Sequence, residues 1–220
     1  MMEIISYPFP ISIFKNTTSI LLDASFLLSL VYDDDIHHNE CIEVFRILLN
    51  KKTNLYVTNI VSAEVLNQIM YKVFINDMRY KIDKKNPFNS SDNIREIMHS
   101  FSKNDRKIIK EKRIDKLREI PYKKYFDNLS KNSTKRYLLE IYYKTAVAMH
   151  NQLENTVKYN YLEINKKCIL KTKEIMVKNF LAINDATHLA ACICNNVEYL
   201  LTLDSDFIYA NCNEVKLLKI

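Results

Sequence analysis

Short apolar runs alternate with amphipathic segments at both ends of the chain. Residues 20–22 form an apolar run that ends at Asp23, and residues 24–31 continue with apolar positions at helical spacing, which predicts a strand followed by a helix. A second helix is predicted over 38–50, and a strand over 55–57 is followed by a helix whose apolar positions recur every four residues. The last forty residues repeat this alternation, with a predicted helix over 184–196, a strand over 199–203, a short turn or helix over 206–210 and a strand over 215–218.

The middle of the chain follows a different pattern. Residues 83–93 are rich in helix-breaking and polar residues, which predicts a loop or hinge. The stretches 92–119 and 134–178 are charged and periodically apolar, so they predict at least two helices. We therefore predict an α/β fold with a central, mostly parallel sheet flanked by helices, and a helical insertion within it. Its parts are 1–75 for the first portion of the α/β domain, 76–180 for the basic helical insertion and 181–220 for the second portion.

Charge is distributed unevenly between these parts. Residues 71–180 carry 26 basic and 13 acidic side chains, a net charge of +13, whereas the two flanks together carry 6 basic and 13 acidic side chains, a net charge of −7. An acidic body joined to a basic middle indicates a site that gathers cations beside a surface that attracts polyanions. The alternative is a solvated helical surface that is simply rich in lysine.

The residues that are absent or scattered exclude several classes of protein. The 220-residue chain has no glycine, which the Walker phosphate-binding loop and the Rossmann dinucleotide-binding turn both need for close approach of the backbone to phosphate. Its five cysteines lack the paired spacing of a tetrahedral zinc site, and we interpret them as buried thiols in a reducing compartment. No segment is long enough for a membrane helix, so we expect a cytoplasmic protein without a membrane partner.

Four acidic residues are the candidates for chemistry. Asp23 and Asp204 follow predicted strands, and Glu64 and Asp185 lie near the starts of predicted helices, so all four point toward the carboxyl-terminal rim of a parallel sheet. Each alone has an ordinary explanation as a turn former, a helix cap or a solvent-facing residue. Two carboxylates held ~4 Å apart repel by roughly 4 kcal/mol at an effective dielectric of 20, so four converging acids need a cation. All-oxygen ligands suit Mg²⁺ or Mn²⁺.

Four short segments carry these acids in a recurring context of strand and helix. They are Leu22-Asp23-Ala24-Ser25, Ser62-Ala63-Glu64-Val65-Leu66, Asn184-Asp185-Ala186-Thr187-His188-Leu189-Ala190 and Thr202-Leu203-Asp204-Ser205-Asp206-Phe207. In order and spacing the set resembles the PIN-domain nucleases, which include the VapC-type toxins of toxin–antitoxin pairs. The resemblance covers about 115 residues, 1–75 and 181–220, and leaves out the middle.

The resemblance implies a three-layer PIN-like fold and a site in which Asp23, Glu64, Asp185 and Asp204 bind metal. A metal-activated water would then attack phosphorus, so that RNA phosphodiesters are hydrolysed to products with 5′-phosphate ends. By the same resemblance Ser25 and Thr202 lie near the metal, and local backbone capping is the alternative for both. Asp206 either assists or shapes the turn. His188 shares a predicted helix with Asp185 and either lines the pocket or packs as an ordinary histidine.

Several functions remain open at this level. The expected activity is that of a metal-dependent endoribonuclease, and in particular the toxin of a toxin–antitoxin pair. The alternatives are a housekeeping RNA-processing nuclease and a non-catalytic RNA-binding or scaffolding module. The basic middle could contact RNA through phosphates and occasional base stacking, clamp the groove, form a homodimer surface or bind an antitoxin peptide.

Overall fold

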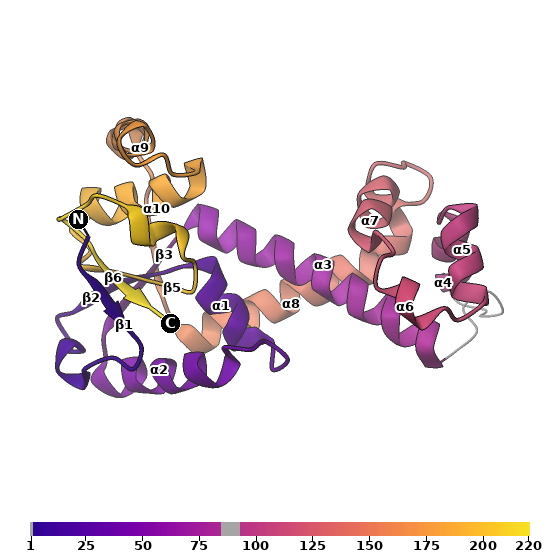
Figure 1. Cartoon of the computed structure of the whole chain (residues 1–220), viewed down its shortest axis with the longest axis horizontal. Coiled ribbons are helices and arrows are strands. Elements are labelled where there is room, and N and C mark those ends of the chain that lie inside the picture. The colour runs from indigo at the N-terminus through magenta and orange to yellow at the C-terminus, as the bar shows by residue number, and fades with distance from the viewer. Residues whose placement is uncertain (1, 85–92) are drawn as a thin grey trace. The chain divides into compact units, whose positions relative to one another are not determined.

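The computed structural model describes residues 2–84 and 93–220 (Figure 1). The chain divides into two compact units, one made of Met1–Val65 with Gln152–Ile220 and the other of Leu66–Asn151. Helices α3 (Asn59–Lys84) and α8 (Glu140–Val157) each contain one of the two boundaries. The sequence predicted an insertion at 76–180. In the structure, residues 66–75 belong to the second unit and residues 152–180 belong to the first.

The first unit is built on a parallel sheet. Six strands occur in the order β1-β6-β5-β2-β3-β4, and every neighbouring pair is parallel. Their bounds are β1 Ile4–Ser6, β2 Ser19–Leu22, β3 Asn54–Thr58, β4 Asn160–Leu162, β5 Tyr199–Thr202 and β6 Lys216–Lys219. The predicted α/β class with a parallel sheet is therefore confirmed.

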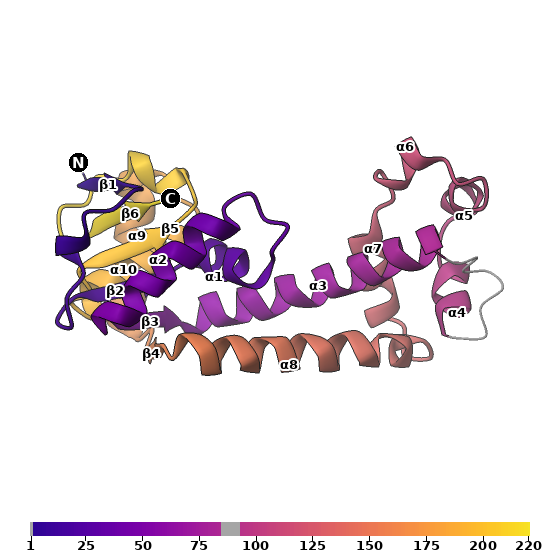
Figure 2. The ribbon, with the colours of Figure 1, turned by 90° about the horizontal axis from the view of Figure 1, so that it is seen from below.

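Helices cover both faces of this sheet, which gives the unit three layers (Figures 1 and 2). Helices α1 (Ala24–Val31) and α2 (His38–Lys51) lie on one face, and α10 (Ile183–Cys194), with α9 (Lys166–Asn179) packed beside it, lies on the other. Leu21, Leu200 and Leu217 are neighbours across β2, β5 and β6 and belong to one buried cluster with Leu189 and Ala190 of α10. This packing places the first turn of α10 beside the central strands.

Two strands differ from the sequence prediction. β1 pairs with β6 and was not predicted, and β4 interrupts the stretch 134–178 that was predicted to be helical. The reason is that β4 is only three residues long and is held by backbone pairing with β3, from Tyr56 opposite Asn160 to Thr58 opposite Leu162. A free sheet edge that offers such hydrogen bonds is not visible in the pattern of a short segment. The short 3-10 helices of this unit are η1 (Ile11–Ile13) and η3 (Asp206–Tyr209).

The second unit is helical and has its own core. It holds α4 (Ile94–His99), α5 (Lys103–Lys110), α6 (Ile114–Leu117), α7 (Tyr122–Ser130) and η2 (Arg136–Leu139) with parts of α3 and α8. The ring of Phe126 packs edge-on against Tyr71 at 5.1 Å and Phe74 at 5.2 Å, and Phe74 packs against Tyr142 at 5.1 Å. The hydroxyl groups of both tyrosines donate to carboxylates, Tyr71 to Asp127 at 2.6 Å, so the buried Tyr142 and the half-buried Tyr71 both keep a hydrogen bond.

The middle of the chain is helical as predicted, and its helices are shorter than the predicted stretches. Residues 94–117 form three short helices, and Ser102 starts the second of them by accepting a hydrogen bond from the Asp105 N–H at 3.0 Å. The loop predicted at 83–93 lies mostly outside the described residues, and α3 continues to Lys84.

All five cysteines are free, and all are buried except Cys194, which is half-buried and so departs from the predicted burial. In residues 2–84 and 93–220, none of the helices combines the length and the hydropathy that crossing a bilayer requires.

Candidate functional site

The topology brings the predicted acids to one rim of the sheet. The chain leaves β2 toward β3 and β4 on one side, and later returns to β5 and β6 on the other, so the order reverses between β2 and β5. Asp23 follows β2 directly, and one residue separates Asp204 from the end of β5. Crevices at such reversal points, outside the carboxyl ends of the strands, are where open α/β sheets bind ligands. Glu64 lies in the first turns of α3, directly after β3, and Asp185 lies in the first turn of α10.

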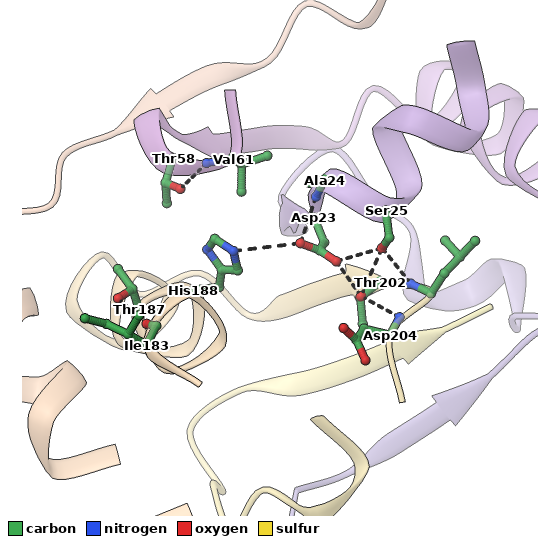
Figure 3. A network of polar contacts seen from close by, with 11 residues as sticks. Asp23, Ala24, Ser25, Thr58, Val61, Ile183, Thr187, His188, Thr202 and Asp204 are labelled. Atoms are coloured by element: carbon green, nitrogen blue, oxygen red, sulfur yellow. Dashed lines mark hydrogen bonds and ion pairs between the residues drawn. The ribbon is translucent and has the colours of Figure 1, made fainter. Parts of the chain in front are cut away.

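Asp23 is held by hydrogen bonds from α1 and from the neighbouring strand β5 (Figure 3). It is the N-cap of α1, and its Oδ1 accepts a hydrogen bond from the Ala24 N–H at 2.7 Å. Its Oδ2 accepts one from the Ser25 hydroxyl at 2.7 Å and one from the Thr202 hydroxyl at 2.6 Å. The carboxylate is buried, and with these three donors its plane is fixed before any ligand arrives.

The hydroxyl groups of Ser25 and Thr202 also accept hydrogen bonds from backbone N–H groups. The Leu203 N–H donates to Ser25 Oγ at 3.1 Å, and the Asp204 N–H donates to Thr202 Oγ1 at 2.9 Å. Each hydroxyl therefore accepts from the backbone and gives its only proton to Asp23. Ser25 and Thr202 thus cap the backbone after β5 and also hold the Asp23 carboxylate.

Asp206 shapes the turn that carries Asp204. Its N–H donates to Asp204 Oδ1 at 2.9 Å, which is the side-chain-to-backbone bond of an Asx turn. The Asp206 side chain itself is exposed. One oxygen of Asp204 is therefore held by the turn itself.

The charges of the acids act on one another. Burial, together with the carboxylates of Asp204, Asp23, Asp206 and Glu64, raises the pKa of Asp185 to about 6. Burial and the carboxylates of Asp23 and Asp204 likewise raise the pKa of Glu64. The structure thus brings the four predicted metal-binding residues, with Asp206, into one region of mutual repulsion, which a bound cation would relieve.

His188 is a neighbour of this site that was left outside the predicted set. It is one helical turn after Asp185, its side chain is nearly inaccessible with the residue 1% exposed, and its Nε2 lies 3.8 Å from Asp23 Oδ1. Burial lowers the pKa of this imidazole, and the Asp23 carboxylate opposes that shift. The spacing of three residues from Asp185 on one helix was the signal that could have placed it beside the acids.

In the described residues, the acidic side chains do not yet form a complete set of metal ligands. Within residues 2–84 and 93–220, no three His, Cys, Asp or Glu side chains lie close enough together to share a metal ion. The chemistry of the donors nevertheless fits a hard divalent cation, because carboxylate oxygens are its preferred ligands and Asp23 is already fixed by its hydrogen bonds. The Glu64 and Asp185 side chains are half-buried.

Asp185→Asn is expected to stabilise the metal-free protein at pH 7 by about 1 kcal/mol, a value discounted for solvent screening of a half-buried group. A carboxyl group whose folded-state pKa is raised stabilises the fold at pH values below its unfolded pKa, here about 4. That contribution is lost as the pH rises through about 6. The asparagine variant should therefore match the wild type at pH 4 and exceed it at pH 7 in urea unfolding with EDTA.

The control for this measurement is Asp33→Asn, an identical change at an exposed position. It should leave stability unchanged at both pH values. Equal stability of wild type and Asp185→Asn at pH 7 would show that the carboxylates do not repel one another as described.

The chain matches no model of a protein family, and no curated protein matches it either.

Proposed function

We propose that this protein is a Mg²⁺- or Mn²⁺-dependent endoribonuclease of the PIN-like type. The observation that carries the proposal is the set of carboxylates at the ends of β2 and β5 and near the starts of α3 and α10, where burial together with the neighbouring carboxylates raises the pKa of Asp185 to about 6. Proteins tolerate such a cluster mainly where it serves a function, since strongly perturbed acids gather at functional sites. The α/β topology and the position of the cluster at the reversal point between β2 and β5 support the same proposal.

The residues of the chain divide the work of such a site. Asp23 is the fixed ligand, because Ala24, Ser25 and Thr202 hold both of its oxygens in place. Asp204 is presented by the turn after β5, and Glu64 and Asp185 add oxygens from the starts of two helices. A bound divalent ion supplies an activated water and neutralises charge on the phosphate.

RNA is the proposed substrate because of the charge on the second unit. Residues 66–151 carry 20 basic and 10 acidic side chains, a net charge of +10, whereas the first unit has a net charge of −4. A positive unit on the same chain attracts a polyanion that the acidic cluster alone would repel. The five free cysteines agree with a cytoplasmic location, where RNA is available.

The cleavage assay is the direct test. The purified chain is incubated with structured RNAs and Mn²⁺, with and without a chelator, and the ends of the products are labelled. We expect cleavage that requires the metal and leaves 5′-phosphate ends. Absence of metal-dependent cleavage on every RNA tested would overturn the proposed activity.

The finer proposal is that this nuclease is the toxin of a toxin–antitoxin pair, with an antitoxin protein as its partner. Its support is the resemblance of the four acidic segments to the VapC-type toxins. Expression of the chain alone should then arrest growth, and co-expression of the cognate antitoxin should relieve the arrest. Normal growth with intact cleavage would favour a housekeeping RNA-processing nuclease.

A non-catalytic RNA-binding module is a second candidate, and one observation favours it. No three potential ligands in the described residues are already close enough to share a metal. Calorimetry with Mg²⁺ and Mn²⁺ separates the two candidates, because the nuclease must bind at least one of these ions and the module need not. Binding that is lost in Asp23→Asn would support the nuclease.

A further inference from the structure

Helix α5 (Lys103–Lys110) separates its charges from its apolar residues. Ile108 and Ile109 are buried in the core of the second unit, whereas Lys103, Lys107 and Lys110 are exposed. On a helix, positions separated by three, four or seven residues lie on one side, so these lysines line one face together with the half-buried Arg106. We call Lys103, Arg106, Lys107 and Lys110 the α5 basic face.

The acidic residue of this helix is used for anchoring. The hydroxyl of Tyr125 donates a hydrogen bond to Asp105, and the ring of Tyr125 stacks on Phe101 at 3.9 Å between centroids. Tyr125 also accepts from the Ser102 N–H at 3.0 Å, beside the N-cap of the helix. These contacts fix the rotation of α5, so its lysines face outward as a set and Asp105 does not neutralise them.

A cleft of about 420 Å³ runs along this face. Its lining residues are His99, Lys103, Arg106, Lys107, Lys110 and Glu111. Glu111, the one acid in this lining, pairs with Lys107 at 3.8 Å and also with Arg113, so it is already engaged by two cations. The Nε of Arg106 has no hydrogen-bond partner within the described residues, and its Nη1 lies 3.5 Å from His99 Nδ1.

We propose that the α5 basic face binds the phosphate backbone of the RNA substrate, an inference that rests on RNA being the substrate of the proposed function. A row of cations with a cleft between them suits a strand of regularly spaced phosphates. An anionic membrane fits less well, because a helix that lies on a bilayer needs an exposed apolar face and the isoleucines of α5 are turned inward. The chemistry is non-specific for sequence, so this face adds affinity and leaves base selection to other contacts.

The test measures RNA binding by the full chain without cleavage. Fluorescence anisotropy of a short labelled single-stranded RNA is recorded in EDTA between about 50 and 200 mM salt, for the wild type and for Lys103→Gln/Lys107→Gln/Lys110→Gln. Each lost phosphate contact removes about 0.7 from the slope of log affinity against log salt, so the slope should fall by about 2. Binding at the lowest salt should weaken roughly tenfold or more.

A matched variant separates this face from the general positive field. Lys131→Gln/Lys135→Gln/Arg136→Gln removes the same charge from another part of the second unit. Its slope should change by less than half as much, and circular dichroism should show both variants folded. Equal changes of the slope in the two variants would overturn the proposal. The proposal would also be overturned if polyglutamate competed with the labelled RNA as well as unlabelled RNA does.

The outcome is independent of the nuclease assay. If the wild type cleaves RNA but both triple variants show the same slope, the proposed function stands and this inference is wrong. A chain that does not cleave RNA but loses slope only in the α5 variant retains the binding face and loses the nuclease.

Discussion

Asp23→Asn is expected to lower the rate of manganese-dependent RNA cleavage by about a thousandfold or more. The change removes the charge from the carboxylate that Ser25 and Thr202 hold in place, so the metal loses its fixed ligand. A metal contributes several kcal/mol to the stabilisation of the transition state, and about 4 kcal/mol corresponds to a thousandfold in rate. Initial cleavage rates at saturating Mn²⁺ measure the effect.

Asp33→Asn is the matched control for this rate measurement as well. It makes the same chemical change in an exposed turn, and its cleavage rate should stay within roughly twofold of the wild type, as is usual for a surface change away from a functional feature. Urea unfolding of both variants shows that the protein is folded. Wild-type cleavage by folded Asp23→Asn would remove Asp23 from the proposed mechanism.

Phe207→Ala is expected to produce the largest loss of stability, about 3–5 kcal/mol in the free energy of unfolding. Phe207 is fully buried in η3, in the same cluster as Leu200 and Leu217 of the sheet, so its removal leaves a cavity under the turn that carries Asp204. Unfolding in urea, followed by circular dichroism, gives the change from the transition midpoint and slope.

Phe180→Ala is the corresponding control, because Phe180 is 93% exposed at the end of α9. The same atoms are removed without a cavity, so the free energy of unfolding should change by less than about 0.5 kcal/mol. If the two alanine variants unfold at the same urea concentration, Phe207 is not part of a tightly packed core.

The acids illustrate how far the sequence reaches. Asp23 and Asp204 follow apolar strands, and the carboxyl ends of parallel strands share one rim, so their proximity was predictable from the order of elements. The spacing of His188 from Asp185 placed it on the same side of the helix, but whether a histidine on an apolar helix faces a carboxylate depends on how the helix is rotated against the sheet. Its distance of 3.8 Å from Asp23 is a result of that packing.

The hydroxyl groups of Ser25 and Thr202 also had contacts that the sequence could not predict. Ser25 and Thr202 were recognised as residues near the acids, but the sequence left open whether they serve the site or the backbone. In the structure each hydroxyl contacts both groups, since the Leu203 and Asp204 N–H groups donate to the two hydroxyls and the hydroxyls donate to Asp23. Residues that are 177 positions apart in the chain create this arrangement, which a local motif does not encode.

The sequence by itself determined the α/β class, the helical nature of the middle and the four acids at one rim, because hydrophobic periodicity and strand order follow from local chemistry. Only the tertiary structure decided that residues 160–162 add a strand beside β3, and that Tyr125 turns Asp105 inward so that the lysines of α5 form one face. Both depend on contacts between segments distant in the chain, whose energies are set by packing rather than by the residues of either segment alone.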